Sequence, residues 1–371
     1  MRLVIGGGGT AGHVFPGLAL IEQWPSPGPQ VWWMGCSGGM EEGLVRSREV
    51  EFLGVRAGAV RGKGPVKMAS SCLQSLVGTA QALIALRRLR PDVVLTTGGF
   101  VSVPVALGAR MARIPLVVFL PDVRPGLAVR VQARFAALVA CAFETDPALM
   151  RGARAMVVTG YPVRARFGAS DPQQARRELG LSEGAPVVLV YGGSQGSRSI
   201  NDAVLAQLDL ILAECQLIHI CGPADLERLE QARKDLTGPS AARYHLSGFL
   251  GDRLALAMAA ADLCVSRAGA STLAELPTAG LPAIVVPGPF SDQAVNAAYL
   301  AERGAAVVLE QDSLSNGGLV RSLRLVLSDS EGLKAMSIAS RALARPQAAS
   351  SLSQELSRIG AGPGRAEVSQ A

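Results

Sequence analysis

The residues best suited to chemistry near the N-terminus lie in the stretch LVIGGGGTAGHVFPGLAL, residues 3 to 20. A buried-strand pattern runs into four consecutive glycines, and a helix pattern then begins with His13 in its first turn. Glycines let backbone N–H groups approach a ligand, and a helix N-terminus stabilises anions such as a diphosphate. The helix dipole there lowers the pKa of a histidine, which favours neutral imidazole, a base. The stretch predicts an anion site beside a general base, and the structural alternative is a ligand-free turn that His13 caps.

The same glycines satisfy a dinucleotide fingerprint only formally. GGGTAG, residues 7 to 12, has the G-x-G-x-x-G spacing of nicotinamide-binding proteins. That motif also requires a carboxylate after the second strand, and VWWMGCSGG, residues 31 to 39, contains none. A P-loop is excluded because no Gly-Lys-Ser/Thr follows the glycines. A nicotinamide oxidoreductase is therefore a rival interpretation, but the carboxylate that its motif requires after the second strand is missing.

A second group of polar residues ends a predicted strand in SRAGASTLAEL, which begins at Ser266. Thr272 and Glu275 have the spacing of a capping box, which would be a sufficient structural reason for both. The functional alternative is that this helix N-terminus, with Ser271, binds phosphate while Glu275 accepts hydrogen bonds from ribose hydroxyls. Spacing alone does not separate the two.

Other polar residues also have both a functional and a structural interpretation. Asp292 and Gln293 follow another predicted strand, and a carboxylate beside a carboxamide suits sugar hydroxyls, with a solvated loop as the alternative. His219 lies within the strand-like LIHICG and is expected in the core, whereas His245 in ARYHLSG is expected in a loop.

The chain repeats itself. PDVVLTTGG from Pro91 matches ADLCVSRAG from Ala261, and each is followed by a helix and a further buried strand. We therefore expect an α/β fold with two Rossmann-like domains whose parallel sheets face a cleft, at residues 1–160 and 161–345. Ligands should bind beyond the carboxyl ends of the strands, in that cleft. Residues 346–371 are expected to be a helix end and a disordered tail.

Composition narrows the classes further. The 371 residues favour two domains, and a chain with 49% hydrophobic but 4% aromatic residues suits alternating strands and helices. Six cysteines without a CxxC pair indicate reduced core thiols rather than zinc or disulfides. No signal peptide or bilayer-length apolar run is visible, so the chain is expected in the cytosol.

Charge is distributed unevenly. Residues 1–160 hold 17 Lys+Arg against 9 Asp+Glu, so this half is predicted to meet an anionic surface. Within it, residues 61 to 91 place Met68, Cys72, Leu76, Ala80, Leu83 and Ile84 at helical spacing between basic ends. Such a stripe is typically core, so membrane contact is expected from the flanking basic residues rather than from the whole stripe.

Six motifs occur in order along the chain: GGTAGHVFPGLA, RGKG, GYPVR, GGSQGSRSIN, SRAGASTLAEL and DQAVNA. Together they resemble the N-acetylglucosaminyltransferases of peptidoglycan synthesis, the MurG family, over roughly residues 2 to 345. The resemblance implies a glycosyltransferase B fold. It also implies transfer of GlcNAc from UDP-GlcNAc to undecaprenyl-pyrophosphoryl-MurNAc-pentapeptide (lipid I to lipid II), in cell-wall synthesis, cell shape and cell division.

The resemblance also places residues in roles. It puts His13 at the transfer site and UDP-GlcNAc mainly on the C-terminal domain. The implied acceptor-binding residues are Gly9, Thr10, Ala11, Gly12, Arg61 and Lys63. The implied donor-binding residues are Thr10, Ala11, Gly12, Asp122, Arg164, Ser194, Gln195, Phe249, Leu250, Ala270, Ser271, Thr272, Glu275, Asp292 and Gln293, with uracil near Phe249 and ribose on Glu275.

One segment departs from the family. Where better-known members read His-Glu-Gln-Asn, this chain reads Phe119-Leu120-Pro121-Asp122. A carboxylate at Asp122 could share or take over the role of base, so His13 and Asp122 are both candidates. Transfer would proceed with inversion, and a metal is not required because the chain has no Asp-x-Asp motif.

The resemblance implies no cofactor and no nucleic-acid partner. It implies peripheral attachment to the cytoplasmic face of the plasma membrane and contact with other cell-wall synthesis proteins. The alternatives left open are a UDP-GlcNAc 2-epimerase of the same fold, a transferase for another lipid acceptor, and a non-enzymatic scaffold that binds UDP-GlcNAc without transfer.

Overall fold

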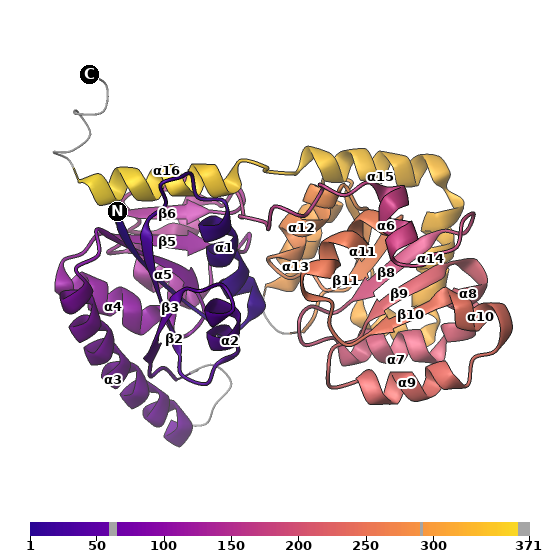
Figure 1. Cartoon of the computed structure of the whole chain (residues 1–371), viewed down its shortest axis with the longest axis horizontal. Coiled ribbons are helices and arrows are strands. Elements are labelled where there is room, and N and C mark those ends of the chain that lie inside the picture. Colours follow the sequence, from indigo (N-terminus) through magenta and orange to yellow (C-terminus); the bar gives the residue numbers. More distant parts are fainter. Residues whose placement is uncertain (59–64, 290–291, 363–371) are drawn as a thin grey trace. The chain divides into compact units, whose positions relative to one another are not determined.

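The computed structural model describes residues 1–58, 65–289 and 292–362, and the chain forms two compact units (Figure 1). One unit is Met1–Arg164 together with the stretch from Pro346, and the other is Ala165–Arg345. Each is a parallel sheet covered by helices on both faces, so the predicted pair of parallel-sheet α/β units is confirmed.

The first unit has a seven-stranded sheet in the order β3-β2-β1-β4-β5-β6-β7. The order reverses between β1 and β4, whose last pair is Gly7 with Gly98, so this is the switch point where ligands of such sheets bind. Its elements are β1 Arg2–Gly7, α1 Ala11–Glu22, β2 Gln30–Cys36, α2 Met40–Arg46, β3 Glu51–Val55, α3 Pro65–Leu89, β4 Val93–Gly98, α4 Ser102–Ala112, β5 Leu116–Leu120, α5 Leu127–Ala133, β6 Leu138–Cys141, η1 Pro147–Met150, β7 Met156–Val158 and α16 Ala348–Ala361.

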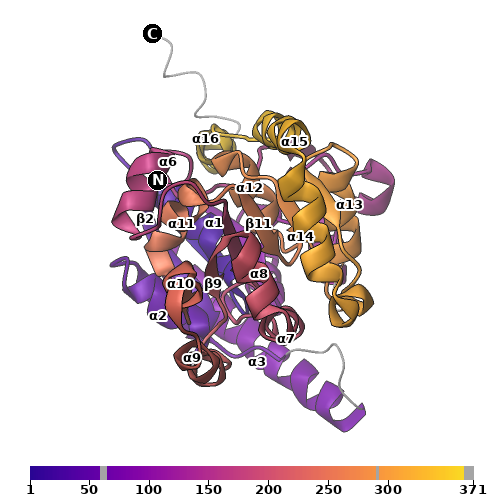
Figure 2. The same cartoon turned by 90° about the vertical axis from the view of Figure 1, so that its right-hand side faces the viewer.

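The second unit has a six-stranded sheet in the order β10-β9-β8-β11-β12-β13, and its switch point lies between β8 and β11. Figure 2 shows α14 beside α15 at one side of this unit. Its elements are α6 Pro172–Glu178, β8 Val187–Tyr191, α7 Arg198–Ala206, α8 Leu208–Glu214, β9 Gln216–Ile220, α9 Leu226–Lys234, α10 Gly238–Arg243, β10 Tyr244–Ser247, η2 Gly251–Arg253, α11 Leu254–Ala260, β11 Leu263–Ser266, α12 Thr272–Ala279, β12 Ala283–Val285, α13 Gln293–Ala301, β13 Ala306–Val308, η3 Gln311–Asn316, α14 Gly318–Ser328 and α15 Ser330–Ala342.

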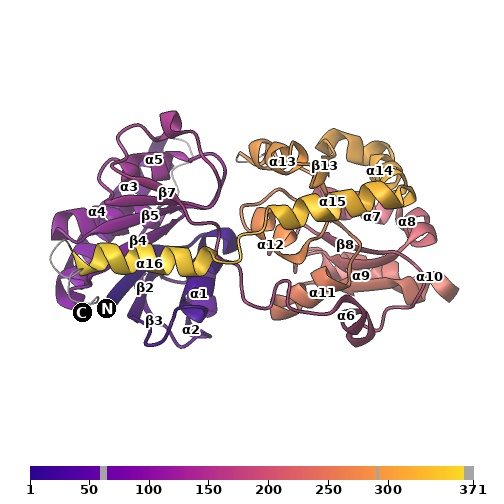
Figure 3. The ribbon, with the colours of Figure 1, turned by 90° about the horizontal axis from the view of Figure 1, so that it is seen from above.

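The last helix belongs to the first unit. Helix α16 lies along α1 and contacts β4, as the yellow ribbon in Figure 3 shows. Its buried face includes Leu352 and Leu356, so residues beyond 345 complete the core of the first unit. The tail predicted beyond this helix, residues 363–371, lies outside the described residues.

Helix α3 corrects the prediction for the apolar stripe. Ala82 and Leu86 are buried, whereas Leu76 is 66% and Ile84 69% exposed. The reason is close helix packing: a Cβ on Gly108 of α4 would lie 3.0 Å from the Cβ of Ala82, so small residues face α4. The predicted stripe therefore faces outward, with Met68, Cys72, Leu76, Ala80 and Ile84 exposed and Leu83 half-buried.

The cysteine prediction holds in the main. Cys141, Cys215, Cys221 and Cys264 are buried free thiols, but Cys72 is exposed on α3 and Cys36 is half-buried. None of the helices within the described ranges has the length and apolar character needed to cross a bilayer.

Candidate active site

His13 lies in the first turn of α1, at the switch point between β1 and β4. Its ring Nδ1 is 3.0 Å from the Thr10 hydroxyl oxygen. Its backbone carbonyl accepts a 2.6 Å hydrogen bond from the hydroxyl of Thr97, which precedes the end of β4. Behind the ring, Gly98 and Gly99 both have positive φ, and a Cβ on Gly98 would lie 2.9 Å from the His13 Nε2. The histidine is therefore held by its own turn, through Thr10, and by the end of β4, through Thr97 and Gly98.

The electrostatics of His13 are those of a poised base. Desolvation by the surrounding protein lowers its pKa below the ordinary value, while the charge of Asp122, a hydrogen bond with the Gly8 backbone and the charge of Glu41 oppose that shift. The direction agrees with the sequence prediction, but the largest cause is burial rather than the helix dipole expected there. Asp122 follows β5 and is partly exposed.

The four glycines before His13 are required by the protein itself. A Cβ on Gly6 would lie 2.7 Å from Val105, and one on Gly7 or Gly8 would overlap side chains of β4 and α2. Gly9 has φ +84° and sits against Phe100. By contrast, the nearest atom to a Cβ on Gly12 is 3.9 Å away. Packing explains Gly6 to Gly9, whereas a side chain at Gly12 would meet only an ordinary contact with Thr10.

The predicted acceptor-binding residues differ in whether their backbone N–H groups already have a partner. The Gly9 N–H donates to the Glu41 carboxylate at 3.1 Å, so this donor is already occupied. Ala11 and Gly12 are half-buried in the first helical turn, where N–H groups have no acceptor within the helix. Arg61 and Lys63 lie outside the described residues.

Arg164 is the last residue of the first unit. Its side chain is buried, and its guanidinium carbon lies 4.7 Å from the centre of the Phe15 ring on α1. This geometry is a cation–π contact, which fixes the arginine against the helix that carries His13.

The predicted donor residues of the second unit lie at the carboxyl ends of four strands. The loop after β8 carries Ser194 and Gln195, and the loop after β10 carries Phe249, which is 55% exposed, and Leu250. The remaining residues follow β11 and β12, and they are Ala270, Ser271, Thr272, Glu275, Asp292 and Gln293.

Two of these residues already make contacts within the protein. The Gln293 side-chain oxygen accepts a 2.8 Å hydrogen bond from the Gly288 N–H, which fixes its amide. Glu275 is buried beside Tyr191, whose pKa rises well above its ordinary value through burial and the nearby Glu275 charge. The Tyr191 hydroxyl lies 3.2 Å from the Thr272 hydroxyl.

The capping-box interpretation is wrong. The N-cap of α12 is Ser271, and its side chain makes no capping hydrogen bond. Thr272 is the first helical residue and binds Tyr191. The sequence spacing was right, but the helix begins at Thr272, one residue earlier than a capping box with Thr272 as its N-cap requires.

Arg267 is a site residue that the sequence reasoning missed. Its guanidinium donates to the hydroxyls of Ser197 and Ser199 and to the carbonyl of Val286, at 3.0, 2.6 and 3.1 Å. It therefore ties the loop after β8 to the loops after β11 and β12. The motif SRAG does place a basic residue where the strand ends. Its spacing, however, does not predict which groups Arg267 binds.

The other two histidines differ from His13. His219 is fully buried in β9, with one ring nitrogen 3.0 Å from the Tyr244 hydroxyl and the other 3.0 Å from the Asn201 side-chain oxygen. Burial lowers its pKa to about 3, so the predicted core role is confirmed. His245, predicted in a loop, instead lies within β10, because its neighbours pair with β9.

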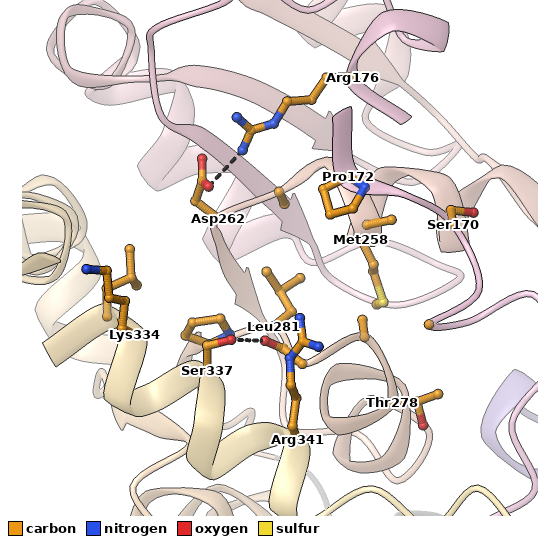
Figure 4. Close-up of a pocket in the computed structure, with 17 residues that line it drawn as sticks. Ser170, Pro172, Arg176, Met258, Asp262, Thr278, Leu281, Lys334, Ser337 and Arg341 are labelled. Carbon is orange, nitrogen blue, oxygen red and sulfur yellow. Dashed lines mark hydrogen bonds and ion pairs between the residues drawn. The ribbon is translucent and has the colours of Figure 1, made fainter. Parts of the chain in front are cut away.

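A cavity of about 380 Å³ occurs elsewhere in the second unit (Figure 4). It lies at the amino ends of β11 and β12, where Asp262 and Pro282 precede the strands. Arg176 and Asp262 form a 2.7 Å ion pair across it, so these charges neutralise each other. None of the predicted site residues lines this cavity.

Comparison with known proteins finds one matching family model in each half of the chain. Residues 3–141 match the glycosyltransferase family 28 N-terminal domain, and residues 187–352 match the family 28 C-terminal domain. A protein of Roseiflexus sp. (strain RS-1) is 38% identical, with 95% of this chain and 93% of that protein covered. It is named UDP-N-acetylglucosamine–N-acetylmuramyl-(pentapeptide) pyrophosphoryl-undecaprenol N-acetylglucosamine transferase.

Solved structures agree. The crystal structure of Acinetobacter baumannii MurG superposes with a TM-score of 0.71 at 26% identity, covering 96% of this chain and 99% of that one. A putative UDP-N-acetylglucosamine 2-epimerase from Listeria monocytogenes, at 14% identity and a TM-score of 0.65 over 97% of this chain and 95% of that one, shares the fold alone. The chain therefore belongs to the MurG family of N-acetylglucosamine transferases, which is built from the two glycosyltransferase family 28 domains.

Proposed function

We propose that this glycosyltransferase moves GlcNAc from UDP-GlcNAc to the MurNAc 4-hydroxyl of undecaprenyl-pyrophosphoryl-MurNAc-pentapeptide, with inversion at the anomeric carbon. The observation that carries the proposal is His13, a histidine of lowered pKa held in the first turn of α1 at the carboxyl edge of the sheet. The substrates are those that the name of the Roseiflexus relative gives.

On the acceptor side, Thr10, Ala11 and Gly12 form the proposed contact with the lipid-linked diphosphate. The free N–H groups of the first helical turn and the positive helix end both attract an anion. Gly9 contributes the shape of the turn rather than a donor, because its N–H binds Glu41. Arg61 and Lys63 stay predicted acceptor residues.

On the donor side, we assign the nucleotide to the carboxyl edge of the second sheet. The N-terminus of α12, with Ala270, Ser271 and Thr272, suits a phosphate, and Glu275 suits ribose hydroxyls. The exposed Phe249 with Leu250 suits a uracil ring. Ser194, Gln195, Arg164, Asp292 and Gln293 complete the proposed donor set, with Gln293 able to offer its amide nitrogen to a GlcNAc hydroxyl.

The proposed chemistry has His13 accept the proton of the attacking hydroxyl. In this proposal Nδ1–H donates to the Thr10 hydroxyl oxygen, so Nε2 is the unprotonated nitrogen that acts as the base. The oxygen attacks the anomeric carbon, the C–O bond to UDP breaks, and the leaving diphosphate gains charge near helix ends that stabilise it. Asp122 either supports the imidazolium that forms or takes the proton itself.

The test is UDP release from UDP-GlcNAc by the purified protein, in a chelator, with and without a short-chain analogue of the lipid-linked MurNAc-pentapeptide. We expect release only when the acceptor is present. Conversion of UDP-GlcNAc to its 2-epimer without acceptor would support the epimerase alternative instead, and donor binding with no product would support the scaffold. Release that depends on an added metal would contradict the metal-free mechanism.

The same assay addresses Asp122. Asp122→Asn should lower kcat by at least about tenfold and leave the KM for UDP-GlcNAc within about twofold, because the carboxylate acts on the transferring proton. Unchanged turnover would show that Asp122 only supports the loop after β5.

We also propose that the first unit contacts an anionic membrane from the cytoplasmic side through α3. Leu73, Leu76 and Ile84 are each more than 60% exposed on this helix, and Arg87 and Arg88 follow in its last turn. The net positive charge of residues 1–160 would support the same contact. Contacts with other cell-wall synthesis proteins stay a prediction.

Vesicle binding tests this surface. The double change Leu76→Ser and Ile84→Ser should reduce binding to phosphatidylglycerol vesicles about tenfold or more, because each apolar side chain contributes on the order of 1 kcal/mol when it enters the interface. The matched control is Leu325→Ser, which alters a residue 71% exposed on α14 of the second unit. If the wild type bound the vesicles equally well at low and high salt, the electrostatic part of the proposal would be contradicted.

A further inference from the structure

Glu41 is a carboxylate buried beneath the glycine turn. It lies in the first turn of α2 and has no solvent-exposed surface. A buried charge is costly unless hydrogen bonds replace its water, so its persistence here needs a reason. The neighbouring Glu42 is partly exposed and pairs with Arg46 in the ordinary way of a surface helix.

The two oxygens of Glu41 have different partners. One accepts the backbone N–H of Cys36, at the end of β2, at 2.8 Å. The other accepts the backbone N–H of Gly9, in the turn before α1, at 3.1 Å. The carboxylate therefore ties the end of one strand to the turn that follows its neighbour, and an amide could not accept both bonds.

The surrounding glycines are shaped around this side chain. A Cβ on Gly39 would lie 2.7 Å from Glu41, and one on Gly35 would lie 2.8 Å from it. A Cβ on Gly8 would overlap its carboxylate. Three glycines thus leave space for one side chain, and Gly8 and Gly9 pass directly over it.

The consequence reaches His13 through a short path. Gly8 hydrogen-bonds with His13, and Gly9 leads into Thr10, whose hydroxyl is 3.0 Å from the ring. We propose that Glu41 is a positioning residue for the transfer reaction, because its bidentate carboxylate fixes the Gly8–Gly9 turn on which the Thr10–His13 pair depends. This inference rests on the proposed function, in which His13 is the base.

An electrostatic effect accompanies the geometric one. The titratable groups that act on His13 are Asp122, which follows β5, and Glu41 from α2, and both charges raise its pKa against the effect of burial. Thr10, Gly98 and Gly99 also lie against the ring and carry no charge. Removal of the Glu41 charge should therefore lower the pKa of His13.

The experiment compares Glu41→Gln with Glu42→Gln. Both remove one carboxylate from the first turn of α2, but only the first breaks a bond to the glycine turn. Glu41→Gln should lower kcat at least tenfold, leave the KM for UDP-GlcNAc within about twofold, and move the acidic limb of the kcat profile to lower pH. Glu42→Gln should resemble the wild type in all three.

NMR supplies readouts that do not depend on activity. The chain has three histidines, so the His13 ring signals can be assigned with His13→Gln and titrated in each variant. The His13 pKa should fall in Glu41→Gln and not in Glu42→Gln. Glu41→Asp, which keeps the charge on a shorter stem, should lose turnover with a smaller change in the His13 pKa.

The wild type gives a further test should the variants unfold. The Gly9 N–H should exchange with solvent slowly, as expected for a hydrogen bond to a buried carboxylate. Fast exchange of Gly9, or Glu41→Gln with wild-type kcat and His13 titration, would overturn the inference. A wild type without acceptor-dependent UDP release would instead overturn the proposed function, while the exchange and titration results would still decide the role of Glu41.

Discussion

The two glycine-rich turns of this chain follow the first strand of each sheet, and each adjoins a buried carboxylate, yet the histidines beside them are bonded differently. Beneath the turn after β1 lies a charged group, Glu41, and the adjoining His13 is partly exposed. The turn after β8 adjoins a network in which Asn201 binds His219, the Cys221 carbonyl and the buried carboxylate of Asp225. A Cβ on Gly196 of this turn would overlap that same carbonyl. In the first arrangement His13 stays partly exposed, whereas in the second both ring nitrogens of His219 are hydrogen-bonded.

The two histidines show what separates a site from a scaffold. Burial lowers the pKa of both, and carboxylate charges oppose the shift at both: Asp122 and Glu41 at His13, and Asp225 at His219, whose pKa still falls to about 3. His219 also has partners on both ring nitrogens. Burial alone therefore does not identify a catalytic histidine. What separates them is that both ring nitrogens of His219 have side-chain partners, whereas His13 lies at the switch point where ligands of such sheets bind.

The largest expected effect is a contrast in activity. His13→Gln should lower kcat by about 10² to 10⁴, the usual contribution of a general base, with little change in the KM for UDP-GlcNAc. His219→Gln should leave kcat within a few-fold, because its ring touches only structural partners. Steady-state UDP release measures both. Equal losses would mean that the distinction between the two histidines is wrong.

The next effect is on stability and its pH dependence. The folded-state pKa of His219 is about 3 and its ordinary value is 6.5, so the folded protein binds fewer protons than the unfolded chain between these values. The stabilisation that His219 provides is complete above pH 6.5 and is lost progressively as the pH falls toward 3. Urea unfolding at pH 7.5 and pH 4.5 should show a smaller loss on acidification in His219→Gln than in the wild type.

At neutral pH that variant should itself be less stable by about 1–3 kcal/mol, because Asn201 or Tyr244 loses a buried partner. Parallel pH dependences in the two proteins would show that His219 does not titrate between these limits.

The smallest effect distinguishes two reasons for glycine. Gly8→Ala would push a methyl group into Glu41 and should destabilise the first unit. Gly12→Ala makes only an ordinary van der Waals contact, 3.9 Å from the Thr10 hydroxyl oxygen, and should not, since alanine also favours the helix. If the acceptor approaches this turn, Gly12→Ala should raise the acceptor KM a few-fold with unchanged melting temperature. An unchanged KM would remove Gly12 from the proposed site.

Much of the fold was predictable because local patterns carry it. The matched stretches from Pro91 and Ala261 form β4 and β11, each at the switch point of its sheet. Short apolar runs bounded by glycine and proline predict parallel strands, and parallel strands collect their following loops at one edge. That rule also explains why the predicted donor residues of the second unit emerge at one edge.

The errors arose where long-range packing decides. The stripe on α3 has the periodicity of a core helix, but small residues at its contact with α4 leave Leu76 and Ile84 outside. Thr272 has capping-box spacing, but Tyr191 from another strand binds it. Periodicity and spacing report on one element, and these outcomes depend on what a second element offers to it.

The sequence by itself determined the two-unit architecture, the glycine turns, the helix that carries His13 in its first turn and the edge at which the site residues collect. These follow from apolar periodicity, turn residues and the handedness of strand–helix–strand connections, which are local rules. Only the tertiary structure decided that Glu41 lies under Gly9, that Arg267 joins three loops, and that His13 stays partly exposed while His219 is buried with both ring nitrogens bonded. Those contacts join residues distant in sequence, and hydrogen-bond geometry and burial become defined only when the sheets have formed.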